Sequence, residues 1–92
     1  MTLEEARAEI AAIDREMAAL FARRMAAAER IAAWKAERGL PIRDEAQEAR
    51  VLERNATQID DPAKRALYLD FLRQVMRLSR QYQEQLTEGS GV

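Results

Sequence analysis

The first third of the chain has apolar side chains at helical spacing, with nothing that would interrupt a helix. Thr2 and Glu5 have the spacing of a capping box, which is typical of a helix start. After Thr2 neither glycine nor proline occurs before Gly39 and Pro41, which together favour a helix stop. The pattern therefore predicts one helix over residues 3–37, roughly 52 Å long at about 1.5 Å per residue.

Two further helices follow, and no segment has the alternation of a strand. Asp44 is the expected N-cap of a second helix that runs to about Gln58. Asp61 as N-cap and Pro62 as first helical residue predict a third helix that runs to about Leu86. The predicted fold class is all-α, a three-helix chain with a very long first helix.

The length of the chain points to one domain whose core is completed by a partner. With 92 residues the chain suits a single domain, which we place at residues 1–86, followed by a flexible tail at 87–92. A small domain is only about 30 Å wide. The rest of one chain therefore cannot cover the first helix, and we expect an intertwined homodimer in which this helix pairs with its symmetry mate.

Composition excludes several classes of function. The net charge of −1, with acids and bases interspersed, argues against a nucleic-acid binder or a polybasic membrane module. The absence of cysteine and histidine removes disulfides, thiolate nucleophiles and the commonest general base and metal ligand. No signal peptide and no membrane-spanning run is visible, so we expect a cytoplasmic protein with no membrane partner and no bound metal.

Charged residues fall where the first helix should be apolar. Placing successive residues about 100° apart, with Ile10 at zero, puts Arg24 near 320° and Lys35 near 340°. Both lie inside the apolar stripe, and Arg7 lies on its border. Long cationic side chains can snorkel out of a shallow interface or pair with buried acids. A buried cation otherwise needs an anionic partner. The apolar stripe consists of Leu3, Ile10, Ile13, Met17, Leu20, Phe21 and Ile31.

The other two helices also turn polar groups toward their apolar faces. Ser79 and Gln83 lie one turn apart on the apolar face of the third helix, where a small polar network would explain them. Glu48 shares a face with Val51 and Leu52, either as an amphipathic margin or as the buried partner of Arg24 or Lys35. Taken together, the inward groups suit a small, multiply anionic ligand that carries a hydroxyl group. Catalysis there would rest on positioning and electrostatics.

The order of these residues resembles the all-helical class of chorismate mutase over nearly the whole chain. The stretch "ARAEIAAIDREMAALFARRM" is similar to the family start "LR..I..ID..L..LL..R", and "IAAWKAERGLPIRDEAQE" to "I...K...g.pi.D..RE". The stretch "FLRQVMRLSRQYQ" resembles the ending "F..I...S...Q". No gap is needed from Arg7 to Glu48. The matched polar positions are Arg7, Asp14, Arg24, Lys35, Asp44, Glu48, Ser79 and Gln83.

The resemblance implies a reaction without cofactor or covalent intermediate. The family converts chorismate to prephenate by a Claisen rearrangement, on the way to phenylalanine and tyrosine, and works as an intertwined dimer with two active sites. By match, Lys35 would contact a carboxylate and the ether oxygen, where negative charge develops as the C–O bond breaks, and Gln83 would donate to the same oxygen. Electrostatic stabilisation of that charge is the expected catalytic effect.

The resemblance also implies which residues bind the rest of the substrate. Arg24 would bind one carboxylate, and Arg7 would reach a carboxylate from the other subunit. Ser79 would line the carboxylate end of the site. Glu48, with the region of Asp44, would hold the ring hydroxyl. Chorismate is thus the expected ligand of a homodimeric site.

One position departs from the family pattern. Where the family commonly has arginine before its glutamate, this chain has Gln47. We count Gln47 among the substrate-binding residues, because its amide can still form hydrogen bonds. One cation is nevertheless missing, and the neighbouring Arg43 is the candidate in the sequence to replace it.

Two alternatives stay open. Isochorismate-pyruvate lyases and aminodeoxychorismate mutases resemble the same scaffold and differ before the second helix and around the 4-substituent. The stretch "PIRDEAQE" looks like the mutase type. A non-catalytic helical dimer that acts as an interaction module would also have three amphipathic helices. That reading leaves the ordered inward set of polar residues unexplained.

Overall fold

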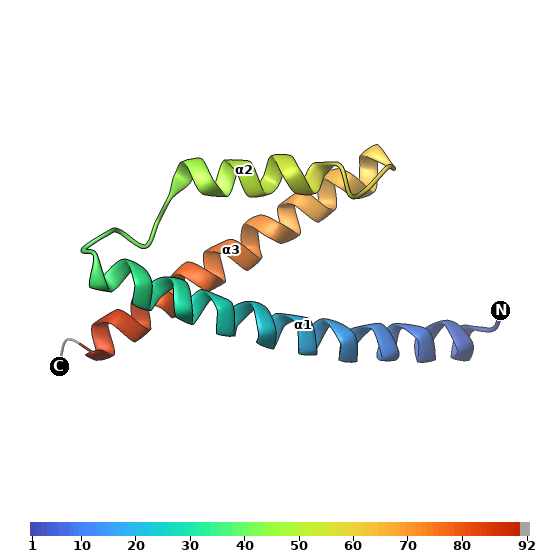
Figure 1. The fold of residues 1–92 in the computed structure, drawn as a ribbon. Helices are drawn as coiled ribbons and strands as arrows, with labels where there is room; N and C mark the ends of the chain where they lie inside the picture. Colours follow the sequence, from blue (N-terminus) through green and yellow to red (C-terminus); the bar gives the residue numbers. More distant parts are fainter. Residues whose placement is uncertain (91–92) are drawn as a thin grey trace.

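Three helices make up the part of the chain that the structure, a computed structural model, describes. It describes residues 1–90, with side chains through residue 87. The helices are α1 (Leu3–Glu37), α2 (Glu45–Ala56) and α3 (Pro62–Ser90), and no strand occurs within residues 1–90. The molecule measures 53 × 27 × 14 Å along its principal axes. The predicted all-α class and the very long first helix are confirmed (Figure 1).

Both ends of α1 are fixed by caps that the sequence predicted. The Thr2 hydroxyl accepts from the Glu5 backbone N–H at 3.1 Å, and the Glu5 carboxylate accepts from the Thr2 N–H at 3.3 Å. At the other end Gly39 has φ of 64°, a left-handed conformation that glycine adopts without a Cβ penalty. The Leu40 N–H then bonds the Lys35 carbonyl at 2.9 Å, as in a Schellman motif. This turn ends α1 and leads into the loop before α2.

Asp44 caps α2 as predicted, but the helix ends slightly early. The Asp44 carboxylate accepts from the Gln47 backbone N–H at 3.0 Å. The last helical residue is Ala56 rather than Gln58. The Thr57 hydroxyl donates to the Arg54 carbonyl at 2.9 Å, which satisfies a group that a further helical turn would have used.

The third helix starts at Pro62, as predicted, and continues past its expected end. Asp61 accepts from the Ala63 backbone N–H at 3.1 Å. At the C-terminal end α3 continues to Ser90, beyond the expected Leu86. Extending an existing helix adds a hydrogen bond for each residue fixed, so the polar tail sequence alone does not stop it. The flexibility predicted for residues 87–92 stays a prediction, and residues 91 and 92 lie outside the described part.

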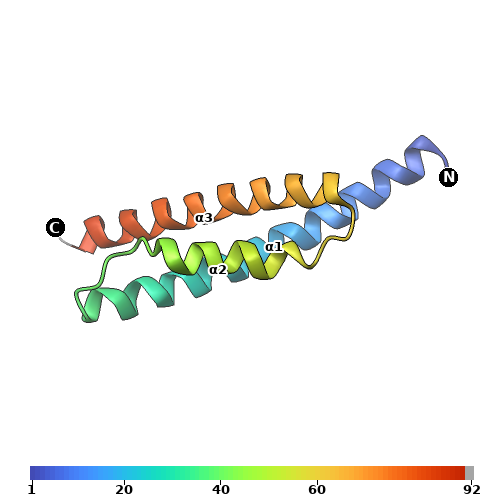
Figure 2. The same ribbon diagram turned by 90° about the horizontal axis from the view of Figure 1, so that it is seen from above.

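The helix α3 packs against both α1 and α2 and holds the chain together. Figures 1 and 2 show α3 crossing the C-terminal half of α1, while the N-terminal half of α1 extends beyond the other helices. Ala28 and Ala32 of α1 are buried, as are Leu72 and Met76 of α3, and the Gln83 amide of α3 donates to the Ala28 carbonyl, so α1 and α3 approach each other closely there. Small alanine side chains allow this close approach. The buried apolar core of the described chain is therefore small and lies at one end of α1.

The N-terminal half of α1 leaves its apolar stripe uncovered within one chain. The six large apolar side chains of this half are 45–59% exposed. They are the predicted stripe residues Leu3, Ile10, Ile13, Met17, Leu20 and Phe21. None of the described helices has an apolar stretch long enough to cross a membrane.

Candidate active site

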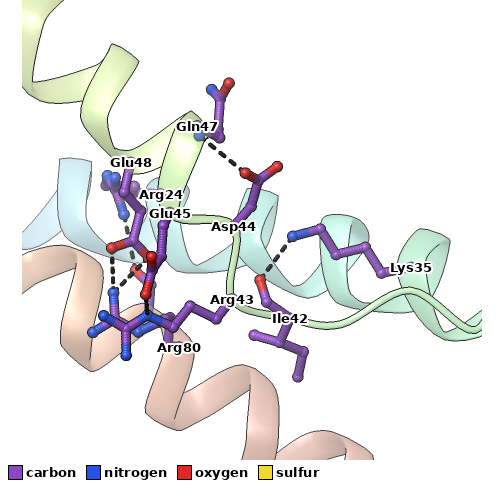
Figure 3. Close-up of polar contacts among 10 residues, drawn as sticks. Arg24, Lys35, Ile42, Arg43, Asp44, Glu45, Gln47, Glu48 and Arg80 are labelled. Carbon is purple, nitrogen blue, oxygen red and sulfur yellow. Dashed lines mark hydrogen bonds and ion pairs between the residues drawn. The ribbon is translucent and has the colours of Figure 1, made fainter.

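An open hollow of about 290 Å³ lies between the C-terminal half of α1, the start of α2 and the C-terminal half of α3. All three helices contribute polar side chains to it, as the sequence predicted. Figure 3 shows several of them as they project from α1, the loop before α2, α2 and α3. Seven of the eight predicted site residues line this hollow: Arg24, Lys35, Asp44, Gln47, Glu48, Ser79 and Gln83.

Arg24 reaches the hollow from α1 and is held by α3. Its Nη1 donates to the Ser79 hydroxyl at 2.8 Å. That hydroxyl in turn donates to the Met25 sulfur at 3.7 Å, and Ser79 is only 7% exposed. A guanidinium carries five N–H donors. Arg24 can therefore be oriented by Ser79 and still bind an anion in the hollow.

Lys35 is oriented by the loop that leads into α2. Its Nζ donates to the Ile42 carbonyl at 2.7 Å, and its own carbonyl accepts from Leu40 in the turn after α1. An ammonium group has three donor hydrogens, so one bond to the loop leaves two for a ligand. The same contact holds the loop, and thus Asp44, against the end of α1.

Glu48 is paired with a residue that the sequence interpretation missed. Nη1 of Arg80 lies 2.5 Å from both carboxylate oxygens of Glu48, and these side chains are only 21% and 24% exposed. Arg24 and Lys35, the partners considered for Glu48 from the sequence, have other acceptors. Arg80 also lines the hollow. The available signal was its position three residues before Gln83, because residues at that spacing are neighbours on a helix.

Gln83 is buried at the contact between α1 and α3. It is 7% exposed, and its Nε2 donates to the Ala28 carbonyl at 2.9 Å. Next to it, the Tyr82 hydroxyl donates to the Glu29 carboxylate at 2.5 Å. This hydrogen bond, more than burial, raises the pKa of Tyr82, because the carboxylate favours the protonated phenol. Both contacts fix α3 against α1 beside the hollow.

Gln47 and Arg43 lie near the mouth of the hollow in different settings. The Gln47 side-chain oxygen accepts from Arg50 at 3.1 Å, and Gln47 lines the hollow. Arg43 instead forms an exposed ion pair with Glu45 at 3.4 Å and lies outside the lining. Arg43, the candidate replacement for the missing cation, lines a second hollow that shares Glu48 and Arg80 with the first.

Arg7 is the one predicted site residue that lies away from the hollow. It precedes Arg24 by 17 residues, or about 25 Å along an α-helix. It is exposed on the N-terminal half of α1, beyond the helices that form the hollow. Within a single chain Arg7 cannot reach a ligand that is bound near Arg24.

The charges of the hollow suit a small anionic ligand. Arg24, Lys35 and Arg80 oppose Asp44 and Glu48, so the lining carries a net charge of +1. Cations and hydrogen-bond donors come from α1 and α3, whereas the carboxylates come from α2 and its N-cap. In the described part of the chain no three carboxylate, histidine or cysteine side chains are grouped as a metal site. The arrangement can bind an anion at one side and a hydroxyl group at the other.

Comparison with known proteins agrees with this geometry. A profile of the family described as chorismate mutase type II matches residues 6–84, most of the chain and all three helices. Comparison with curated proteins and with solved structures gives no match. The profile spans every residue that lines the hollow. With its three helices and its very long first helix, the chain belongs to the all-helical chorismate mutase type II family.

Proposed function

We propose that the protein is a chorismate mutase, which rearranges chorismate to prephenate on the way to phenylalanine and tyrosine. The observation that carries the proposal is the convergence of Arg24, Lys35 and Gln83 on one hollow, in a chain that the family profile matches over residues 6–84. Chorismate has two carboxylates, a ring hydroxyl and an enol ether. The hollow offers cations, carboxylates and an amide to these groups.

The reaction needs no acid, base or nucleophile from the protein. One ether C–O bond breaks while a C–C bond forms between the enolpyruvyl methylene and the ring, so electrons move in a cycle and no proton is transferred. We assign Lys35 and the second N–H of the Gln83 amide to the ether oxygen. A donor aimed at developing charge in a water-poor site typically contributes about 3 kcal/mol.

The other groups of the substrate are assigned to residues at either side. Arg24 binds one carboxylate, with Ser79 orienting the guanidinium through the 2.8 Å hydrogen bond. Glu48, supported by Asp44 and Gln47, accepts from the ring hydroxyl. Holding both ends folds the flexible enolpyruvyl arm over the ring, which adds an entropic share to catalysis.

The active form in this proposal is a homodimer. The exposed stripe on the N-terminal half of α1 includes Ile10, Met17 and Phe21, and it is longer than the rest of the chain can cover. Pairing α1 with its symmetry mate buries these side chains. It also carries Arg7 of one subunit to the hollow of the other, where we assign it to a substrate carboxylate. The cytoplasmic location stays a prediction.

Chorismate turnover tests the proposal. The loss of the enolpyruvyl absorbance is measured with wild-type protein and with Arg24→Ala, and the product is identified by its acid conversion to phenylpyruvate. We expect rapid formation of prephenate by the wild type and loss of most of the rate in the variant, because a carboxylate then lacks its bidentate partner. A control variant, Arg23→Ala, removes an exposed arginine next to Arg24 that does not line the hollow.

Wild-type protein that leaves chorismate unchanged would exclude the mutase assignment. Isochorismate and aminodeoxychorismate would then be tested in the same assay, since the departure at Gln47 lies beside the residue assigned to the ring substituent. Inactivity toward all three substrates would favour the helical interaction module.

A further inference from the structure

Among the described residues that line the hollow, Arg80 is the charged one that neither the sequence pattern nor the assigned roles use. It lies on α3, directly after Ser79, and lines the hollow together with Arg24 and Lys35. Figure 3 shows Arg80 and Glu48 pointing toward each other from α3 and α2. The two residues are 32 positions apart in the sequence, so only the fold brings them together.

The contact between Arg80 and Glu48 is close and shielded. One guanidinium nitrogen lies 2.5 Å from each carboxylate oxygen. Both side chains are more than three-quarters buried, whereas the other ion pairs among the described side chains, Arg38–Glu37 and Arg43–Glu45, are 46–78% exposed. Shielded, charge-assisted hydrogen bonds of this kind hold a side chain in one orientation. Arg80 therefore determines where the Glu48 carboxylate points.

Arg80 also determines the net charge of the side chains that line the hollow. With Arg80 the lining carries a net charge of +1, and without it the charges of Arg24 and Lys35 would be cancelled by those of Asp44 and Glu48. A ligand with two carboxylates would then meet a hollow with no net charge and a carboxylate without a partner. Removing one member of a shielded pair leaves the other charge uncompensated, which is strongly unfavourable.

Arg80 also lies where it can replace the cation that is absent at position 47. Gln47 is adjacent to Glu48 on α2, and both line the hollow. Arg43 does not line this hollow and forms an exposed pair with Glu45. An arginine at position 47 and an arginine at position 80 would each add one positive charge to the lining of the same hollow.

We propose that Arg80 is a positioning and specificity residue of the active site: it orients Glu48 toward the substrate hydroxyl and offsets its charge, so that the hollow accepts a dianionic substrate despite the glutamine at position 47. The proposal rests on the proposed function, because the substrate class is that of chorismate. It assigns to α3 a cation that the family pattern places on α2.

Steady-state kinetics with chorismate test this inference. The variants are Arg80→Met, which keeps the aliphatic stem, Arg80→Lys, which keeps the charge, and the double variant Arg80→Met with Gln47→Arg. Arg77→Met is the matched control, because Arg77 lies on the same helix, is exposed and does not line the hollow. Circular dichroism and thermal unfolding accompany each assay.

We expect Arg80→Met to raise KM about 10- to 100-fold, the usual effect of removing a charged hydrogen-bonding group. The change in kcat should be smaller, because the lost interaction is present before and during the reaction. The KM of Arg80→Lys should lie between the KM of the wild type and that of Arg80→Met. The added arginine at position 47 should lower KM again by at least about fivefold, a recovery that a residue with a merely structural role would not allow. The KM and kcat of Arg77→Met should equal those of the wild type.

Three results would overturn the inference. One is a KM for Arg80→Met within twofold of the wild type. Another is a loss of activity that Gln47→Arg does not reverse, and the third is unfolding of both Arg80→Met and Arg80→Lys at the assay temperature, which would make Arg80 a structural residue. In each of these cases wild-type turnover leaves the proposed function standing. An inactive wild type overturns the proposed function and this inference together.

Discussion

At the scale of single residues, the site depends on side chains that have one partner in the protein and spare donors for a ligand. Lys35 is the clearest example, because its bond to the Ile42 carbonyl orients the ammonium group without using all of its hydrogens. Arg24 and Ser79 show the same design. Such groups are oriented before the substrate arrives, which is what electrostatic catalysis requires.

Replacing Lys35 should therefore affect the chemical step more than binding. We expect Lys35→Met to lower kcat on the order of 100- to 1,000-fold with chorismate, because charge on the ether oxygen develops only in the transition state. Lys64→Met is the control, since Lys64 is an exposed lysine at the start of α3 and does not line the hollow. A kcat within tenfold of the wild type would remove Lys35 from the catalytic role.

The residues of the site were partly readable from the sequence. Arg24, Lys35, Ser79 and Gln83 could be predicted because a polar side chain on an apolar helix face is visible from spacing alone. The pairing of Arg80 with Glu48 could not be predicted, because Arg80 lies at the edge of that face and Glu48 lies on another helix. Contacts between distant segments depend on how the helices pack, which the spacing within one helix does not fix.

At the scale of helices, caps place the site residues. Asp44 lies at the end of the loop that Lys35 contacts, and it caps the start of α2. The cap therefore fixes the direction in which the side chains of Gln47 and Glu48 project from α2. Caps are local, and for that reason the starts of all three helices could be predicted from the sequence. The ends of α2 and α3 were less predictable than that of α1, and at the end of α2 the hydrogen bond of the Thr57 hydroxyl competes with one more turn.

Two substitutions of Asp44 can separate its role as the N-cap of α2 from the effect of its negative charge. Asp44→Ala should lower the free energy of unfolding by about 1 kcal/mol, because the Gln47 N–H loses its acceptor. Asp44→Asn keeps a side-chain oxygen and should leave stability nearly unchanged, while both variants lose the negative charge in the hollow. Urea denaturation at one fixed protein concentration compares them. Equal stability of Asp44→Ala and the wild type would contradict the assigned cap.

At the scale of the whole molecule, one chain leaves the apolar stripe of its longest helix uncovered. The hollow lies at one end of α1, while the apolar stripe and Arg7 lie at the other. A helix of 35 residues is too long for the two remaining helices to cover, so its length alone predicted that a partner is required. Pairing of two copies would bury the apolar stripe of α1, and it would also bring Arg7 of each subunit to the hollow of the other.

Mixing two inactive variants tests most directly whether two chains share each site. Arg7→Ala and Arg24→Ala should each be nearly inactive with chorismate. In an equimolar mixture that has exchanged subunits, half of the dimers are mixed, and each mixed dimer contains one site with both arginines. We predict that the mixture regains about a quarter of wild-type activity. A mixture no more active than the separate variants, with subunit exchange verified by mass spectrometry, would contradict the shared site.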